Sequence, residues 1–282
     1  MQFVQSADGV FSDYHVILCD VWGVLHNGRQ AWPGASAALT AARAAGKTVI
    51  LITNSPRPHA GVRIQLGEFG VPDDAYDAIA TSGDVTRALI SEAPRRQFHL
   101  GPDRDYPLFE GLDIELVDEF EANAVVCTGL FDDETETPDT YEEMLTRMRG
   151  RNLPFICANP DIVVERGDRL VYCAGALARR YALMGGRTMI AGKPHKPIYD
   201  RAMDLAAQAR GRPVEKTQTL VIGDGVTTDV KGAVDNGFDL MFVTDGIHAR
   251  EYGEPGVPDL EKVVAFLDDF GAKPVATMTK LT

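Results

Sequence analysis

Polar side chains able to do chemistry directly follow four short apolar runs of this 282-residue chain. They are Asp20 after residues 16–19, Thr53-Asn54-Ser55 after 48–52, Gly223-Asp224-Gly225 after 219–222, and Thr244-Asp245-Gly246 after 240–243. Asp229 stands five positions after Asp224, and Lys193 lies within Gly192-Lys193-Pro194. Each residue alone is typical of a turn, a helix cap or a solvated surface. Their joint order is what indicates a site.

Together, these residue types are suited to phosphoryl transfer. Two or three carboxylates bind Mg²⁺, a hard cation that prefers oxygen ligands. The cation and an ammonium group neutralise a phosphoryl group and its transition state. A carboxylate aimed at phosphorus can be the nucleophile, giving an aspartyl phosphate that water then hydrolyses. Hydroxyl, amide and backbone N–H donors can hold the phosphoryl oxygens.

The apolar runs are the elements that must position these groups. They are short and rich in β-branched residues, which predicts strands buried on both faces. The Ala-rich segment 35–45, ended by Gly46, and the segment 230–236, ended by Gly237, predict helices between pairs of strands. Strand, helix and strand in this order indicate a parallel sheet with right-handed crossovers. Ligands bind at the carboxyl ends of such strands, so neighbouring strands would gather the polar groups at one rim.

The middle of the chain predicts a second α/β unit inserted into the first. Its strand candidates are residues 97–100, 124–128 and 155–158, and its helix candidates are 140–149 and 174–184. Asp132 to Glu143 is strongly acidic and is interpreted as a solvated loop that leads into a helix. We therefore expect an α/β core at residues 1–80 and 187–282, and an α/β cap at residues 81–186.

The composition and net charge of the chain limit the kinds of molecule that it is expected to bind. The chain is 45% hydrophobic and 24% charged, which is ordinary for a globular protein. Its net charge of −13 makes nucleic acid and anionic membranes poor partners. No GxGxxG follows a strand and no GxSxG occurs, which argues against a dinucleotide enzyme and an ester hydrolase. Four cysteines without metal-site spacing, no signal-peptide pattern at Met1-Gln2-Phe3 and no long apolar stretch predict a cytoplasmic protein.

The order of the motifs resembles the haloacid dehalogenase-like (HAD) hydrolases. The resemblance lies in Asp20-Val21-Trp22-Gly23-Val24-Leu25, Thr53-Asn54-Ser55, Gly192-Lys193-Pro194, and Gly223-Asp224 followed by Asp229. Thr81-Ser82-Gly83 and Asn159-Pro160-Asp161 resemble the class IIA branch, which carries a large α/β cap. That branch contains nucleotide, sugar, p-nitrophenyl and pyridoxal phosphate phosphatases. The similarity extends from about Tyr14 to Phe270.

The resemblance implies a role for each matching position. It implies a Mg²⁺-dependent phosphatase that hydrolyses a small phosphate monoester of a metabolite through an aspartyl phosphate. The implied nucleophile is Asp20, the metal ligands are Asp20, Asp224, Asp229 and the backbone carbonyl of Trp22, the phosphoryl ligands are Thr53, Asn54 and Ser55, and the neutralising cation is Lys193. The cap is expected to close over the rim and exclude water. A homodimer through the cap is a further expectation from the resemblance.

Trp22 departs from the family pattern, which has an acid–base Asp at this position. Indole can only donate a hydrogen bond, so it cannot replace a catalytic acid. Three interpretations stay open: a substrate whose leaving group needs little protonation, a substitute such as His26, or a weakly active or non-catalytic protein that binds a phosphorylated ligand. Transfer to an alcohol acceptor instead of water is a further alternative. Asp161, Cys173 and Arg179 are candidates to face the substrate from the cap.

Overall fold

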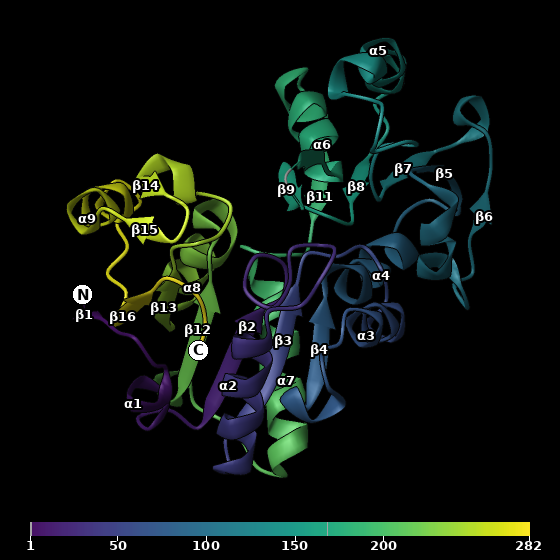
Figure 1. Ribbon diagram of the computed structural model, residues 1–282. Coiled ribbons are helices and arrows are strands. Elements are labelled where there is room, and N and C mark those ends of the chain that lie inside the picture. Colours follow the sequence, from purple (N-terminus) through teal and green to yellow (C-terminus); the bar gives the residue numbers. More distant parts are fainter. Residues whose placement is uncertain (1, 168) are drawn as a thin grey trace. The chain divides into compact units, whose positions relative to one another are not determined.

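The computed structural model in Figure 1 describes residues 2–167 and 169–282. Met1, where the predicted core begins, and Asp168, within the predicted cap, lie outside the described residues. The chain divides into two compact units: unit 1 is Met1–Thr53, Arg63–Ala80 and Tyr199–Thr282, and unit 2 is Asn54–Val62 and Thr81–Ile198. Unit 2 thus includes residues 54–62 and 187–198, which the sequence analysis assigned to the core, and the domain boundaries stay a prediction.

Unit 1 is built on a seven-stranded parallel sheet, counted over the described residues. Its order is β1 (Gln2–Phe3), β16 (Ala276–Met278), β13 (Asp239–Val243), β12 (Thr219–Gly223), β2 (Val16–Asp20), β3 (Thr48–Thr53) and β4 (Ala78–Thr81). Every residue of β2, β3 and β12 is buried. Such continuous apolar strands fit a parallel sheet covered on both faces, so the predicted fold class is confirmed.

Proline and glycine residues mark the ends of some of the helices associated with this sheet. They are α1 (Asp8–Phe11), α2 (Pro33–Ala44), α3 (His59–Glu68), α7 (Lys196–Arg210), α8 (Lys231–Asn236) and α9 (Leu260–Asp268). Helix α2 has Pro33 in its first turn, where a missing N–H costs nothing. Gly46 and Gly237 follow α2 and α8 with φ values of 82° and 72°, which glycine adopts without strain. The two predicted helices with glycine stops are therefore confirmed.

Strand register explains why the polar residues gather at one rim. Asp20, the last residue of β2, is opposite Ile52 of β3, one residue before Thr53. On the other side of β2, Cys19 is opposite Ile222 of β12, and Gly223 of β12 is opposite Phe242 of β13. These strands are parallel, so their carboxyl ends lie along the same edge of the sheet.

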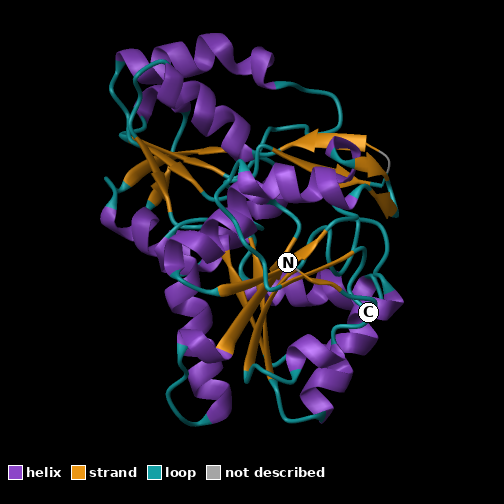
Figure 2. Ribbon diagram, turned by 90° about the vertical axis from the view of Figure 1, so that its left-hand side faces the viewer, coloured by secondary structure: helices purple, strands orange, loops and turns teal. Residues whose placement is uncertain are grey.

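Unit 2 contains a separate five-stranded parallel sheet, again counted over residues 2–167 and 169–282. Its order is β11 (Thr188–Ile190), β8 (Phe155–Cys157), β7 (Ala124–Cys127), β5 (Arg96–Leu100) and β6 (Glu115–Leu116), and its helices are α4 (Ser82–Glu92), α5 (Glu142–Gly150) and α6 (Ala174–Leu183). In each unit, helices lie on both sides of the strands (Figure 2). The strands and helices predicted for the middle of the chain are confirmed.

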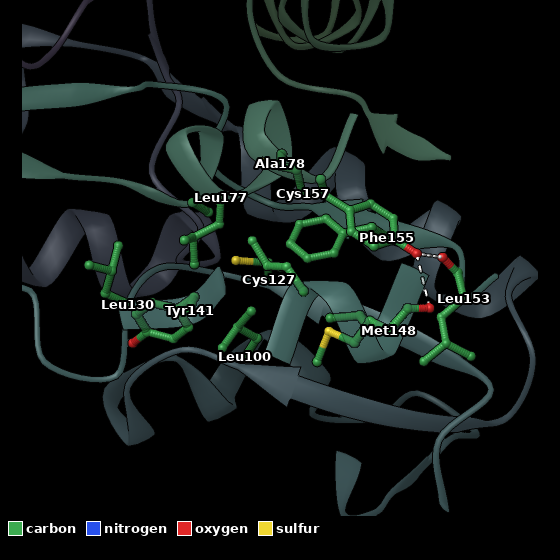
Figure 3. Close-up of a cluster of buried hydrophobic side chains, with 14 residues drawn as sticks. Leu100, Cys127, Leu130, Tyr141, Met148, Leu153, Phe155, Cys157, Leu177 and Ala178 are labelled. Carbon is green, nitrogen blue, oxygen red and sulfur yellow. Dashed lines mark hydrogen bonds between the residues drawn. The ribbon is translucent and has the colours of Figure 1, made fainter. Parts of the chain in front are cut away.

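Alternating residues of the unit 2 strands bury two different faces. Val125, Cys127 and Phe155 pack with α5 and α6 in the cluster drawn in Figure 3, whereas Val126 and Ile156 pack with α4 on the other face. The clusters are Leu100, Val125, Cys127, Leu130, Tyr141, Leu145, Met148, Leu153, Phe155, Cys157, Ala174, Leu177, Ala178 and Tyr181 on the first face, and Ile90, Leu108, Phe109, Val126, Ile156 and Ala158 on the second. Each large apolar side chain buried in this way contributes roughly 1.5–3 kcal/mol to folding.

Short elements complete the chain. Strands β9 (Val163–Arg166) and β10 (Arg169–Tyr172) pair antiparallel, as do β14 (Gly253–Glu254) and β15 (Val257–Pro258). The short helical turns are η1 (Asp73–Ala75), η2 (Asp103–Phe109), η3 (Glu119–Glu121), η4 (Pro138–Tyr141), η5 (Lys216–Gln218), the π-helical η6 (Val226–Val230) and η7 (Ala249–Glu251). Across the described residues, none of the helices combines the length and the apolar character that a membrane crossing demands.

The acidic stretch 132–143 differs in part from its predicted solvated loop. The side chain of Asp133 is only 9% exposed and is bound by Arg104 and Arg166. Glu134 accepts from Arg166 at 2.7 Å and from Arg169 at 2.9 Å. The prediction was wrong for Asp133, because its arginine partners are distant in sequence and no local pattern reveals them.

Candidate active site

Three buried carboxylates of unit 1 come together at the rim of the sheet. Asp20, Asp224 and Asp229 each offer an oxygen, and these oxygens all lie within 4.8 Å of one another. The exposed fractions of the three residues are 6%, 5% and 1%. A tight group of buried like charges is costly unless a cation or protons offset it, so this arrangement is suited to a bound cation.

Backbone N–H groups fix the orientation of all three carboxylates. Val21 N–H donates to Oδ1 of Asp20 at 2.7 Å, and Ile247 N–H donates to Oδ2 of Asp224 at 2.8 Å. Gly225 N–H donates to Oδ2 of Asp229 at 3.1 Å. These bonds hold one oxygen of each carboxylate in a fixed direction.

Asp229 owes its place to an unusual turn. It lies in the π-helical segment Val226–Val230, which follows the glycine-rich end of β12 and leads into α8. The wider π turn changes the direction of a side chain relative to a regular α-helix, and such turns are frequent at functional sites. The sequence places Asp229 near Asp224 but contains no signal for the π turn itself.

Two loop glycines and the glycine that ends β12 make room for the carboxylates. A Cβ at Gly23 would lie 2.3 Å from Oδ2 of Asp224, and one at Gly246 would lie 2.0 Å from the same atom. A Cβ at Gly223 would lie 2.2 Å from Cγ of Asp229. Gly23 also has φ of 87°, where other residues are strained. Gly246 belongs to the Thr244-Asp245-Gly246 motif, and its packing role explains why glycine stands there.

The donor set fits Mg²⁺. Oxygen ligands from one or two carboxylates, completed by water and substrate, are typical of Mg²⁺ sites. Asp20, Asp224 and Asp229 supply such oxygens within one buried group. The carbonyl of Trp22 as a further ligand stays a prediction.

His26 is enclosed by aromatic rings. It is 1% exposed, its ring centroid lies 5.0 Å from that of Trp22 and 4.9 Å from that of Phe69, and its Nδ1 accepts from Gly28 N–H at 3.0 Å. Burial lowers the pKa of His26 to about 4. An enclosed, neutral imidazole with one nitrogen already bonded is poorly suited to replace a catalytic acid at neutral pH.

A second polar group lies in unit 2 and joins three residues of distant sequence. Lys193 N–H donates to Oδ1 of Asn54 at 2.7 Å. Nδ2 of Asn54 donates to Oδ1 of Asp161 at 2.8 Å and to the carbonyl of Lys193 at 3.3 Å. Asn54 and Lys193 are each only 2% exposed. Both atoms of the Asn54 amide thus have protein partners.

Thr53 and Ser55 flank Asn54 in the chain. Thr53 ends β3 and is 5% exposed. The carbonyl of Ser55 accepts from Gly83 N–H at 3.0 Å, and its hydroxyl accepts from Arg57 N–H at 3.3 Å. A Cβ at Gly83 would lie 2.2 Å from the carbonyl oxygen of Pro56, so this glycine lets the start of α4 pack on the segment after Thr53.

The predicted site residues therefore form two groups. Asp20, Asp224 and Asp229 are together in unit 1, with Trp22, His26 and Thr53 in the same unit, whereas Asn54, Ser55 and Lys193 belong to unit 2. Of the cap candidates, Asp161 contacts Asn54, Cys173 is buried at the start of α6, and Arg179 is exposed on α6. The Asn159-Pro160-Asp161 motif drew attention to Asp161, but no sequence signal indicated its contact with Asn54.

Comparison with known proteins gives consistent matches. Residues 17–115 match the family described as haloacid dehalogenase-like hydrolase, and residues 190–270 match the one described as HAD-hydrolase-like. The crystal structure of a haloacid dehalogenase-like hydrolase from Brucella suis 1330 is 54% identical, with a TM-score of 0.91 over 99% of this chain and 100% of that chain.

Two curated relatives align with most of this chain. Human haloacid dehalogenase-like hydrolase domain-containing protein 2 is 29% identical over 239 residues, 82% of this chain and 84% of that protein. The acid sugar phosphatase of Staphylococcus aureus (strain USA300) is 25% identical over 245 residues, 84% of this chain and 89% of that protein.

Proposed function

We propose, since the chain belongs to the haloacid dehalogenase-like hydrolase family and to its class IIA-like branch, that it is a Mg²⁺-dependent phosphatase acting on a small phosphate monoester. The observation that carries the proposal is the buried group of Asp20, Asp224 and Asp229, whose oxygens lie within 4.8 Å of one another. The net charge of −13 favours a small phosphorylated metabolite over nucleic acid as the substrate.

In the proposed reaction, Asp20 is the nucleophile. One of its oxygens is held by Val21 N–H at 2.7 Å, which fixes the carboxylate at the end of β2. Attack of Asp20 on phosphorus forms an aspartyl phosphate as the bond from phosphorus to the leaving oxygen breaks. Water then attacks the aspartyl phosphate, releasing phosphate and restoring the carboxylate. Bound Mg²⁺ supplies charge neutralisation at the phosphoryl oxygens.

The other proposed roles concern charge and orientation. The Lys193 ammonium neutralises the transferred group, and the Thr53 hydroxyl holds one of its oxygens. Asp224 and Asp229 hold the cation beside Asp20, with their orientations set by Ile247 N–H and Gly225 N–H. These roles follow from the family resemblance, and the backbone bonds to Asp224 and Asp229 support the roles of those two carboxylates.

Trp22 determines which substrates we expect to react well. A positioned acid contributes about 10²–10⁴-fold to such a reaction, and no carboxylate stands at position 22 to supply it. Aryl and acyl phosphates have leaving groups that need little protonation. We therefore propose that they react faster than alkyl phosphates such as sugar phosphates, although the Staphylococcus aureus relative is named for sugar phosphates.

Steady-state phosphate release tests the proposal. p-Nitrophenyl phosphate, acetyl phosphate and a set of sugar and nucleotide monophosphates are compared with Mg²⁺ present and with Asp20→Asn as the blank. Turnover above the blank supports the phosphatase, and a bias toward aryl and acyl substrates supports the effect of Trp22. Product analysis with an added alcohol detects transfer to an acceptor other than water.

A weakly active or non-catalytic phospho-ligand binder is the second candidate. The observation that favours it is Trp22, whose ring is packed against His26 with a centroid distance of 5.0 Å. No turnover above the blank on any substrate, together with a Mg²⁺-dependent rise in melting temperature on adding phosphate, would support this candidate instead.

A further inference from the structure

The side-chain amide of Asn54 is hydrogen-bonded to both the backbone N–H and the backbone carbonyl of Lys193. Its Oδ1 accepts from Lys193 N–H at 2.7 Å, and its Nδ2 donates to the Lys193 carbonyl at 3.3 Å. An asparagine amide has two N–H donors, and the second is directed at Oδ1 of Asp161 at 2.8 Å. The side chain thus connects the lysine to a carboxylate 107 positions away from Asn54 in sequence.

Asp161 favours the same orientation of the Asn54 amide as the backbone N–H and carbonyl of Lys193 do. An ionised carboxylate is only an acceptor, so it selects the amide orientation that turns Nδ2 toward it. The flipped amide would set Oδ1 against the Asp161 carboxylate and the Lys193 carbonyl, and Nδ2 against Lys193 N–H, so three attractive contacts would become repulsive. Both residues that Asn54 contacts would then lose their alignment.

The surrounding backbone leaves little room for Asp161 or Lys193 to shift. A Cβ at Gly192 would lie 2.8 Å from Oδ1 of Asn54, and also 2.8 Å from Cγ of Pro160. A Cβ at Gly175, in the first turn of α6, would lie 2.1 Å from the carbonyl of Pro160 and 2.4 Å from that of Asp161. The loop that carries Asp161 is therefore packed between the start of α6 and the chain just before Lys193.

We infer that Asp161 is a positioning residue for Lys193 and acts through Asn54. The inference rests on the proposed function, in which the Lys193 ammonium neutralises the transferred phosphoryl group. A displacement of about 1 Å in a catalytic group can cost about 10²-fold in rate, so the alignment of the Lys193 backbone matters to the chemistry. In this inference the Asn54 amide positions Lys193 and does not itself bind the phosphoryl group.

An isosteric exchange of the two side chains tests this directly. Asn54→Asp places a second carboxylate against Asp161, and we expect kcat to fall about 10-fold or more, with KM changed much less. Adding Asp161→Asn to that variant restores a donor–acceptor pair. The amide introduced at position 161 can donate to the carboxylate introduced at position 54, and that carboxylate still accepts from Lys193 N–H. We expect the exchanged pair to recover only part of the lost kcat, because the carboxylate at position 54 cannot donate to the Lys193 carbonyl as the Asn54 amide does at 3.3 Å.

A cycle of alanine variants gives a second readout. Asp161→Ala and Asn54→Ala are each expected to lower kcat, and the double variant should lose no more than Asn54→Ala alone, because residues that act in one chain of contacts are not additive. Glu119→Ala is the matched control: Glu119 is a 9% exposed carboxylate of the same unit that accepts two bonds from Arg147. It should lower the melting temperature without changing kcat.

Two results would overturn the inference. One is additive losses in the alanine cycle, and the other is an exchanged pair no more active than Asn54→Asp alone. The exchange changes no side-chain volume appreciably, so it remains informative if Asp161→Ala fails to fold. Wild-type turnover equal to that of Asp20→Asn would instead refute the proposed phosphatase, which separates the two failures.

Discussion

The indole of Trp22 lies against Gly28 so closely that a Cβ at position 28 would be 2.5 Å from Cζ2 of the ring. Gly28 also has φ of 79°, and its N–H donates to Nδ1 of His26 at 3.0 Å. The Trp22 ring is therefore closely packed within the turn that follows β2. The residue at the position of the usual acid is held in place by packing, which makes a substitution there informative.

Trp22→Asp should raise the hydrolysis of alkyl phosphates more than that of aryl phosphates. A new carboxyl group at this position can protonate a poor leaving group, whereas p-nitrophenolate needs little protonation. Acid–base catalysis contributes about 10²–10⁴-fold where it is well positioned, and part of that gain should appear in kcat/KM for a sugar phosphate. The measurement is kcat/KM for a sugar phosphate and for p-nitrophenyl phosphate in both proteins.

Trp22→Asn is the control for that comparison. It has nearly the shape of the Asp variant and the same loss of indole packing, but it has no proton to give. If Asn and Asp produce the same change on both substrates, the gain comes from space and not from acid catalysis, and the assignment of position 22 fails.

Mg²⁺ should raise the melting temperature of the protein through the three clustered carboxylates. A ligand that binds only the folded state stabilises it by RT ln(1 + [L]/Kd), which is about 2.7 kcal/mol at 100 times Kd. Asp224→Asn removes one charge from the group whose oxygens lie within 4.8 Å of one another, so the Mg²⁺-dependent shift should shrink or vanish. Without Mg²⁺ the same variant should be at least as stable as wild type, because it relieves repulsion.

Asp235→Asn is the matched control for the metal experiment. Asp235 belongs to the same unit, is about half exposed and pairs with Lys231 across one helical turn. The Asp235→Asn substitution should leave the Mg²⁺-dependent shift in melting temperature unchanged. An equal shift in wild type and Asp224→Asn would show that Mg²⁺ acts elsewhere.

The strands and the rim could be predicted from sequence because their signals are local. Apolar runs of four or five residues predict buried parallel strands, and glycines such as Gly46 and Gly237 mark helix ends. Parallel order then places the residues after those strands, Asp245 included, at one edge, and the family resemblance selected Asp20, Asp224 and Asp229 among them as metal ligands.

Contacts between distant side chains could not be predicted in this way. Asp161 and Asn54 are 107 positions apart, and the ring of Phe69 against His26 comes from a segment 43 positions away. Neither contact leaves a periodic pattern in the sequence. The enclosure of His26 is what turns a plausible acid into a buried neutral ring, and it depends on tertiary packing that spacing does not encode.

The cysteines should be unreactive in the folded protein. Cys19, Cys127, Cys157 and Cys173 are all buried. Burial raises the pKa of Cys157 to about 12 and raises those of Cys127 and Cys173 well above their usual range. Because the thiolate is the reactive form, a disulfide reagent such as 5,5′-dithiobis(2-nitrobenzoate) should titrate no thiol at pH 8 without denaturant and all of them in denaturant. Rapid release of one equivalent from the folded protein would contradict this.

His99 should make the stability of the protein fall as the pH falls below about 6.5. Its Nε2 lies 2.9 Å from Oγ1 of Thr128, its ring packs on Tyr106 and Phe109, and burial lowers its pKa from 6.5 to about 4, against a smaller opposing effect of Asp103. Between those two values the unfolded chain binds more protons than the folded one, so the contribution is complete above pH 6.5 and is lost on the way down to pH 4. His99→Gln keeps a polar group near Thr128 without this titration. Melting temperatures of both proteins from pH 7.5 to 4.5 should therefore converge as the pH falls, with the wild type losing more, while parallel curves would exclude His99 as a contributor.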